Sequence, residues 1–454
     1  MMSKLGPEQF LDFVLSTQLD DFSADAKNRA LWNILDTMGA IIAGGQEDEI
    51  IKLIRCLGMK APLISTVLGD NFQKVGEMSA AFLNGMAGTS LEVDPGHRYA
   101  VGHPSIHVLP AVLALAEQEH RPGSDLLLSY LIGYEVTSRI GMACSLRPLF
   151  HPHGIFGTVG AAVACAHFGG ADENLLRQTM NISCSFVMAN SWQNALQGSS
   201  ARNACAGMAG HFGILAWRMA TSGCIGFDGA LSETFGRLVG EGFSYGKMLE
   251  GLGNPFEIER YYTKLYACCG SIHPTLDAVD EIRQRRSIDP GRIQRILVRT
   301  FFPTSSFSAR DPLNSMASRF SVPYAIAALL VSGECMPQSF SRDALENPNI
   351  VELSRKVDVV EDPSFTVRLP EERCSAVEII LEDGTSESAF RTDHRGSYLA
   401  PHSDEELEGK FLGLTERVIG REGARAILQE IMGIEKIKDI SLLTEKIRGY
   451  RSDL

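Results

Sequence analysis

A buried helix is predicted by residues 157–166, which read Gly157-Thr158-Val159-Gly160-Ala161-Ala162-Val163-Ala164-Cys165-Ala166. A helix with such small side chains lets neighbouring backbones come close, so we expect it at the centre of a helical domain. Residues 204–222 are similar, with glycines at 207, 210 and 213. Because each glycine destabilises a helix by about 1 kcal/mol relative to alanine, close packing must offset that cost.

Apolar residues at helical spacing predict further helices before and after this run. They lie within residues 31–42, 75–87, 106–118 and 126–144. From about residue 270 the pattern changes to that of a mixed domain. Expected there are helices at 274–285 and 322–331, strands at 293–300, 376–381 and 386–392, and weaker strands at 356–360 and 366–369. Asp383-Gly384 is a hairpin signal, so we expect an antiparallel sheet.

Helical texture returns after residue 397 and opens with a capping box, Ser403 to Glu406. These last helices are expected to rejoin the first ones. The predicted fold is therefore mainly α, a large all-helical domain with an inserted smaller α+β lid domain. The predicted boundaries are 1–268 for the first helical part, 269–400 for the lid and 401–454 for the C-terminal helices.

The composition of the 454-residue chain excludes several functions. Its formal net charge is −13, which argues against a nucleic-acid or anionic-membrane partner. It has no apolar run of 18 residues and no signal peptide, so we expect a cytoplasmic protein. The ten cysteines form no Cys-x-x-Cys pair, which favours buried reduced thiols over a structural zinc site.

Reactive side chains are dense in residues 92–105, which read Glu92-Val93-Asp94-Pro95-Gly96-His97-Arg98-Tyr99-Ala100-Val101-Gly102-His103-Pro104-Ser105. Loops held by rigid elements are where binding and catalysis concentrate. The alternative is a polar surface turn with a helix cap.

Three histidines precede a proline: His103, His151 and His273. Composition alone predicts about 0.5 such pairs. The residue before proline is pushed out of the helical region and proline suits the first helical turn, so His103 and His273 are expected just ahead of helices. There the exposed N–H groups and the dipole favour a neutral ring, as a base requires. The alternative is a capping or hydrogen-bonding histidine.

Other candidates are Arg202, which enters a small-residue helix, Lys264, nine residues before His273, and Tyr324, in a helix of small and apolar residues. Each has a structural alternative: a surface arginine, a solvated lysine and a core tyrosine. Phosphate-loop, dinucleotide, nucleophile-elbow and zinc-protease motifs are missing from the sequence. What remains is a site of histidines, cations and carboxylates without cofactor or metal, which suits proton abstraction next to a carboxylate.

The order of several short motifs resembles the MmgE/PrpD family along nearly the whole chain. They are Gly102-His103-Pro104-Ser105 with residues 108–117, Phe150-His151-Pro152 with residues 156–162, Arg202 with residues 206–209, Lys264 with residues 271–274, and residues 320–324. The resemblance implies the helical domain and lid described above, a homodimer, and a site between the domains without metal or organic cofactor. It also implies catalytic positions at His103, His151, Lys264, His273 and Tyr324.

Several positions depart from that pattern. Glu92 and Asp94 stand for the first two aspartates of an Asp-x-Asp-Asp-Thr run, and Pro95-Gly96 replaces its end. Arg202 replaces a lysine, which keeps a carboxylate clamp but loses a proton donor. The extra pair His97-Arg98 redraws the pocket. We therefore expect Glu92, Asp94, His97, Arg98 and Arg202 to bind substrate.

The leading hypothesis is a lyase that removes water from a small di- or tricarboxylate, in the manner of 2-methylcitrate dehydratase. His103 or His273 would transfer the proton, Arg202 and Lys264 would hold carboxylates, and Tyr324 or His151 would assist the leaving group. The alternatives are decarboxylation as for cis-aconitate, epimerisation as for iminodisuccinate, and a degenerate member that only binds carboxylates.

Overall fold

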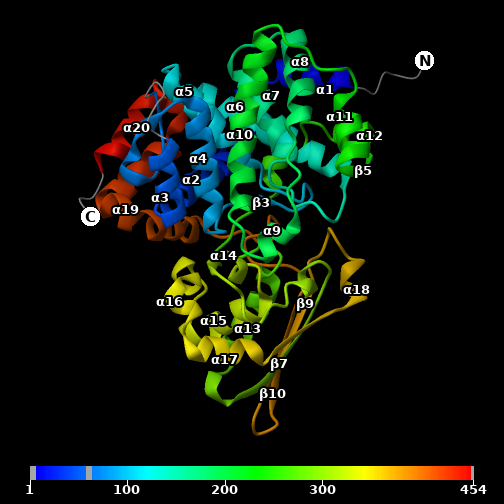
Figure 1. Cartoon of the computed structure of the whole chain (residues 1–454), viewed down its shortest axis with the longest axis vertical. Helices are drawn as coiled ribbons and strands as arrows, with labels where there is room; N and C mark the ends of the chain where they lie inside the picture. Colours follow the sequence, from blue (N-terminus) through cyan, green and yellow to red (C-terminus); the bar gives the residue numbers. More distant parts are fainter. Residues whose placement is uncertain (1–6, 58–63, 451–454) are drawn as a thin grey trace.

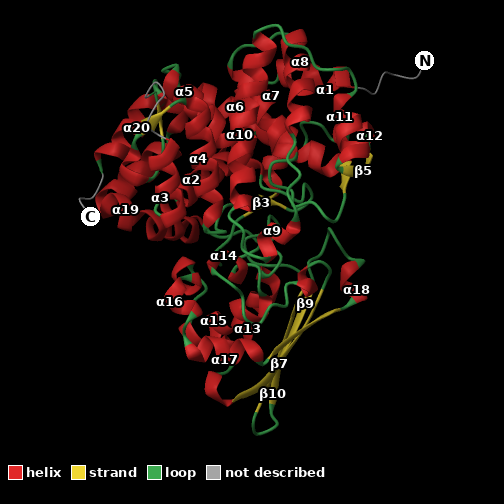
Figure 2. Cartoon of the chain, viewed as in Figure 1, coloured by secondary structure: helices red, strands yellow, loops and turns green. Residues whose placement is uncertain are grey.

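The computed structural model describes residues 7–57 and 64–450, which form a larger helical part and a smaller part with most of the strands (Figures 1 and 2). The helices of the larger part are α1 Pro7–Ser16, α2 Ala24–Gly44, α3 Asp48–Leu57, α4 Glu77–Ser90, α5 Pro104–Gln118, α6 Gly123–Ala143, α7 Phe156–Phe168, α8 Glu173–Ser183, α9 Trp192–Leu196, α10 Ala201–Thr221, α11 Ala230–Glu233, α12 Tyr245–Leu249, α19 Asp404–Met432 and α20 Ile440–Gly449. Its short strands are β1 Ser65–Thr66, β2 Lys74–Val75, β3 Gly96–His97, β4 Cys144–Leu146, β5 Gly240–Phe243 and β6 Tyr261–Tyr262.

The helix α7 lies at the centre of the helical part, as predicted from its small side chains. All its residues except His167 are buried, and it packs against α5, α6 and α10. The glycines of α10 allow the close approach: a Cβ on Gly207 would lie 2.1 Å from the Phe82 carbonyl oxygen of α4, and one on Gly213 would lie 2.7 Å from Ala161 Cβ of α7. Close packing with small residues thus offsets the helix cost of glycine.

The lid contains six helices and one sheet among the described residues. They are α13 His273–Arg285, α14 Ser315–Ser318, α15 Val322–Ser332, α16 Arg342–Leu345, α17 Pro348–Arg355, α18 Pro363–Thr366, and strands β7 Ile293–Thr300, β8 Val357–Glu361, β9 Ser375–Leu381 and β10 Ser386–Arg391. The sheet order is β10-β9-β7-β8, and α13 packs on β9 and β10. The expected hairpin is β9–β10, with Gly384 at φ 80° in its turn.

Two details of the lid prediction were wrong. The sheet is mixed, because β8 runs parallel to β7 with Val298 opposite Val359. Parallel pairing needs a long crossover, and the 56 residues from 301 to 356, which carry α14 to α17, supply it. Residues 366–369 form no strand, because Asp362 caps the backbone N–H of Ser364 and Pro363 starts the short helix α18.

The C-terminal helices return to the helical part, where α19 packs on α2 and α20 packs on α5 (Figure 1). Ser403 caps α19 by the expected reciprocal bonds with Glu406. The mainly α fold with an α+β lid is therefore confirmed, while the residue boundaries 268/269 and 400/401 stay predictions. Within residues 7–57 and 64–450, no helix is long and apolar enough to cross a membrane.

Candidate active site

The reactive loop 91–103 connects α4 to α5 and is held by a short antiparallel ladder. Gly96 pairs with Tyr262 and His97 pairs with Tyr261. This ladder brings Lys264, which follows β6 by two residues, beside Glu92 and Asp94. Glu92 has a φ of 55°, a conformation that is costly for a non-glycine residue and requires strong tertiary contacts. Those contacts are ionic.

Two carboxylates and two cations form a buried charge cluster under the loop. Glu92 accepts a hydrogen bond of 3.2 Å from Lys264 Nζ and forms an ion pair with Arg202. Lys264 Nζ also lies 3.7 Å from Asp94 Oδ1. All four side chains are at most 1% exposed. Two positive and two negative charges therefore neutralise each other out of water, as burial requires.

The pKa values in this cluster follow from burial and from these charges. Burial alone would raise the pKa of Asp94, but His103 and Lys264 outweigh it and hold that pKa well below its usual value. The pKa of Glu92 is likewise lowered, against its burial, by Arg202 and Lys264. Burial would lower the pKa of Lys264, but Glu92 and Asp94 raise it. All three groups are therefore charged at neutral pH.

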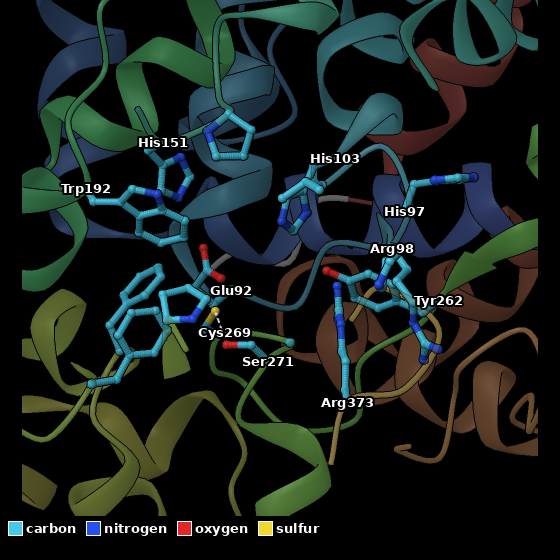
Figure 3. Close-up of a pocket in the computed structure, with 18 of the residues that line it drawn as sticks. Glu92, His97, Arg98, His103, His151, Trp192, Tyr262, Cys269, Ser271 and Arg373 are labelled. Carbon is cyan, nitrogen blue, oxygen red and sulfur yellow. Dashed lines mark hydrogen bonds between the residues drawn. The ribbon is translucent and has the colours of Figure 1, made fainter. Parts of the chain in front are cut away.

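His103 connects the charge cluster to the cavity. It is the N-cap residue of α5, with Pro104 next to it as predicted. Its Nδ1 lies 2.8 Å from Asp94 Oδ2 and 3.1 Å from the Pro95 carbonyl oxygen. Since both neighbours are acceptors, Nδ1 carries a proton. Nε2 has no hydrogen-bond partner in the described part of the chain, and the ring borders the cavity (Figure 3). Nε2 is thus the nitrogen available for proton transfer.

A row of neutral histidines lies behind His103. Arg202 donates to the hydroxyl of Thr89 over 2.7 Å, Thr89 Oγ1 lies 3.2 Å from His153 Nε2, and His153 Nδ1 lies 3.0 Å from His107 Nε2. Burial lowers the pKa of His107 to about 3. Burial and the charge of Arg202 hold the pKa of His153 well below its usual value. Neutral rings fit this chain, with each hydroxyl or N–H donating to the next ring.

His151 borders the cavity next to this row. Burial, followed by the charge of Arg202, holds its pKa well below the usual value, so its ring is neutral. The Nε of Arg202 lies 3.4 Å from its Nε2. His151 therefore contacts the cavity as an uncharged hydrogen-bonding group.

The predicted residues His97 and Arg98 border the cavity but are engaged in structural contacts. His97 Nδ1 accepts from the backbone N–H of Ala100, and its Nε2 lies 3.1 Å from Glu257 Oε2. Both ring nitrogens are therefore occupied. Arg98 donates to the Glu371 carbonyl oxygen over 2.9 Å and pairs with Asp393, both in the lid.

His273 and Tyr324 are not brought together with the other predicted residues at the cavity. His273 is the first residue of α13, and its Nε2 lies 3.3 Å from the Cys268 carbonyl oxygen. Its ring contacts those of Tyr266 and His394. The hydroxyl of Tyr324 donates to the Ser339 carbonyl oxygen over 3.0 Å, inside the lid core. Neither residue borders the cavity in this arrangement of the two parts.

The cavity has a volume of about 190 Å³ and lies between the two parts. Figure 3 shows the ring of Trp192 near His151, with two further aromatic rings below it. The apolar side of the cavity is formed by Val101, Trp192, Phe301, Pro303, Phe307, Phe320, Leu369 and Pro370. Arg98, Tyr262 and Arg373 line another side (Figure 3). Among the residues that the structure describes, no group of His, Cys, Asp and Glu is arranged to hold a metal ion.

Comparison with known proteins was then informative about this architecture. Residues 8–244 match the MmgE/PrpD N-terminal domain, and residues 266–435 match the MmgE/PrpD C-terminal domain. The chain belongs to the MmgE/PrpD family.

Curated relatives in the MmgE/PrpD family align over nearly the full length. The chain is 26% identical to cis-aconitate decarboxylase from Aspergillus terreus, with 94% of this chain and 92% of the relative aligned. It is 26% identical to cis-aconitate decarboxylase from Homo sapiens, with 99% and 96% aligned, and 26% identical to that from Mus musculus, with 99% and 94% aligned.

This MmgE/PrpD protein also has cavity residues that sequence reasoning missed: His153, Tyr262 and Arg373. His153 follows His151 by two residues, and Tyr262 lies two residues before Lys264, so both were within reach of a motif search. Arg373 had no local signal, because only the fold brings the lid loop to the cavity.

The departure at Pro95-Gly96 has a structural reason. A Cβ on Gly96 would lie 2.4 Å from both Cζ and Oη of Tyr262. Only glycine therefore leaves room for this phenol at the cavity.

Proposed function

We propose that this MmgE/PrpD protein is a lyase that removes carbon dioxide from a small unsaturated di- or tricarboxylate. The observation that carries the proposal is His103, whose Nδ1 is fixed by Asp94 and whose Nε2 borders the cavity without a protein partner. The near full-length similarity to cis-aconitate decarboxylases supports the same reaction class.

His103 is suited to give a proton to carbon. The buried carboxylate of Asp94, 2.8 Å from Nδ1, orients the ring and stabilises the imidazolium form. A proton on Nε2 is then directed into the cavity. Asp94 in turn is held by Lys264, so that the donor does not depend on solvent for its orientation.

The aromatic side of the cavity suits the departing carboxylate. Trp192 and Phe307 have ring centroids 5.9 Å apart, and Phe307 and Phe320 have centroids 6.1 Å apart. The nearest cation there, Arg202, is already bound by Glu92 and by the hydroxyl of Thr89. A carboxylate next to this wall is poorly solvated, whereas carbon dioxide is neutral, so the surroundings favour its loss.

The proposed reaction balances with one proton. The bond between carbon and the departing carboxylate breaks, and its electron pair moves into the adjacent double-bond system. The carbon at the other end of that system takes the proton from His103 Nε2. Solvent then reprotonates His103, so each turnover consumes one proton and releases one carbon dioxide.

Dehydration is the second candidate and is favoured by one observation. The ring of Tyr262 lies 6.5 Å from that of His103 between centroids, and both line the cavity. Burial raises the pKa of Tyr262, so its hydroxyl stays protonated and is able to give a hydrogen bond to a departing hydroxyl while His103 acts as the base.

A substrate panel followed by proton spectra in heavy water tests the proposal. The panel contains cis-aconitate, citrate, 2-methylcitrate and iminodisuccinate. Decarboxylation predicts a product with one carbon fewer and one deuterium at carbon. New vinyl signals without loss of carbon would instead show dehydration, and deuterium exchange with inversion would show epimerisation. Binding without any turnover would contradict a lyase.

We also propose that the protein is a cytoplasmic homodimer that works without metal or organic cofactor. The family resemblance supports the dimer, and exposed apolar side chains such as Ile225 and Phe227, 83% and 57% exposed, offer contact surface. Light scattering after size exclusion tests the dimer: a monomer mass at micromolar concentration would contradict it. Unchanged turnover after dialysis against a chelator is expected.

A further inference from the structure

The charges around the cavity are balanced at one end and unbalanced at the other. Next to His103, the cations Arg202 and Lys264 are matched by Glu92 and Asp94. These two cations are therefore already neutralised. A bound anion needs positive charge that the protein has not neutralised itself.

Arg98 lies at the other end and still has an unused donor. Its terminal nitrogens bond to the lid, at Glu371 and Asp393, but its Nε is buried and has no hydrogen-bond partner among the described residues. The whole side chain is only 2% exposed. An unpaired donor on a buried cation is costly, so it points to an acceptor that arrives with a ligand.

Arg373 supplies the unbalanced charge. It lines the cavity from the lid, with its Cζ 5.4 Å from the ring centroid of Tyr262. Within residues 7–57 and 64–450, no carboxylate lies within ion-pair distance of its guanidinium, and its side chain makes no hydrogen bond. Burial and the nearby charge of Arg98 lower its pKa, although an arginine stays charged. Two guanidinium groups so close together repel each other unless an anion joins them.

The hydroxyl of Tyr262 completes the group. Figure 3 shows Tyr262 beside Arg98 and Arg373 at the same side of the cavity. Its hydroxyl makes no hydrogen bond in the described part of the chain, and Gly96 is the residue that leaves it room. Guanidinium and phenol donors together match the planar acceptor geometry of a carboxylate.

We propose that Arg98, Arg373 and Tyr262 form a binding site for a substrate carboxylate that is retained through the reaction. The inference rests on the proposed function, and it assigns the substrate class: a molecule with at least two carboxylates, one held here and one lost at the aromatic wall. Since Arg373 and the partners of Arg98 belong to the lid, the bound carboxylate also links the lid to the helical part.

Calorimetric titration with propane-1,2,3-tricarboxylate, the saturated and unreactive analogue of cis-aconitate, tests the site. Because a hydrogen bond to a charged group contributes about 1.5–3 kcal/mol, Arg373→Leu should raise Kd by about 10- to 100-fold. Arg373→Lys should recover part of the affinity, and Tyr262→Phe should raise Kd by about 3- to 10-fold. The control is Arg342→Leu, which removes the same charge from a lid side chain that is 90% exposed and should stay within about twofold of wild type.

Three results would overturn the site: no binding of the analogue to wild type, a Kd for Arg373→Leu within twofold of wild type, or an equal loss in Arg342→Leu. Circular dichroism checks that each variant folds, and Arg373→Gln carries the same expectation if the leucine variant does not. Binding that depends on Arg373 without turnover of any panel substrate would sink the proposed function alone. Turnover with binding that is independent of Arg373 would sink this inference alone.

Discussion

The ion pair between Lys264 and Glu92 gives a prediction whose size follows from the structure. Their charged atoms are 3.2 Å apart and both side chains are at most 1% exposed. At an effective dielectric constant of about 20, the attraction is about 5 kcal/mol. Removing one partner leaves a buried charge uncompensated, which costs about 3–5 kcal/mol. Lys264→Met and Glu92→Gln should therefore each lower the free energy of unfolding by about that amount.

The double variant should lose less than the sum of the single losses, because it buries no extra unpaired charge. We expect a coupling free energy of at least about 1.5 kcal/mol, within the range for contacting residues. Urea denaturation followed by circular dichroism at neutral pH measures all four proteins, with the midpoint and slope fitted for each.

The pair Lys446 and Glu430 is the matched control. Its charged atoms are 2.6 Å apart, closer than those of the buried pair, but its side chains are 38% and 36% exposed. Solvent screening should limit its coupling to at most about 1 kcal/mol. If Lys264 and Glu92 couple no more strongly than this exposed pair, the reasoning about the buried charge cluster is refuted.

Three further predictions concern the catalytic histidine, the pH response and the glycine of β3. His103→Gln should lower kcat by about 10²- to 10⁴-fold, whereas His120→Gln, at a ring that is 69% exposed, should leave steady-state kinetics unchanged. Because the pKa of Asp94 is lowered in the fold, its stabilisation is present above the ordinary carboxyl range and is lost as pH falls; between about pH 5 and pH 2 the wild type should lose more stability in urea titrations than Asp94→Asn, and an equal loss would contradict the assignment. Gly96→Ala places a Cβ 2.4 Å from a phenol ring and should cost about 1–3 kcal/mol and raise KM, while thermal scans of Gly409→Ala, in α19 with open space, should show no loss.

Local sequence signals predicted most of the fold because local chemistry determines those elements. The small residues of α7 left few packing arrangements other than a central one, and the strand 293–300 was predicted at its observed bounds. Pairing partners are not local, so the parallel β8 was missed. Residues 366–369 looked extended from their β-branched side chains, but the cap at Asp362 determines a helical turn.

The candidate site was predicted where its residues lie close in sequence. Glu92, Asp94 and His103 share one loop, and their mutual contacts are present. The expectation that Arg202 and Lys264 hold substrate did not anticipate that Glu92 binds both of them.

Contacts across the domain junction had no local signal. Arg373 lies 275 residues after Arg98, and only the lid fold brings the two together. The partner of His97, Glu257, is equally remote in the chain. A sequence pattern that names a reactive side chain therefore does not reveal whether another side chain already occupies it.

The central claim is that His103 protonates carbon while a carboxylate leaves as carbon dioxide. Carboxyl-¹³C-labelled cis-aconitate in heavy water tests it most directly, with labelled carbon dioxide and product deuterium measured in the same sample. The account predicts one labelled carbon dioxide and one carbon-bound deuterium per turnover in the wild type, and loss of both in His103→Gln. Release of labelled carbon dioxide by His103→Gln at the wild-type rate would contradict it.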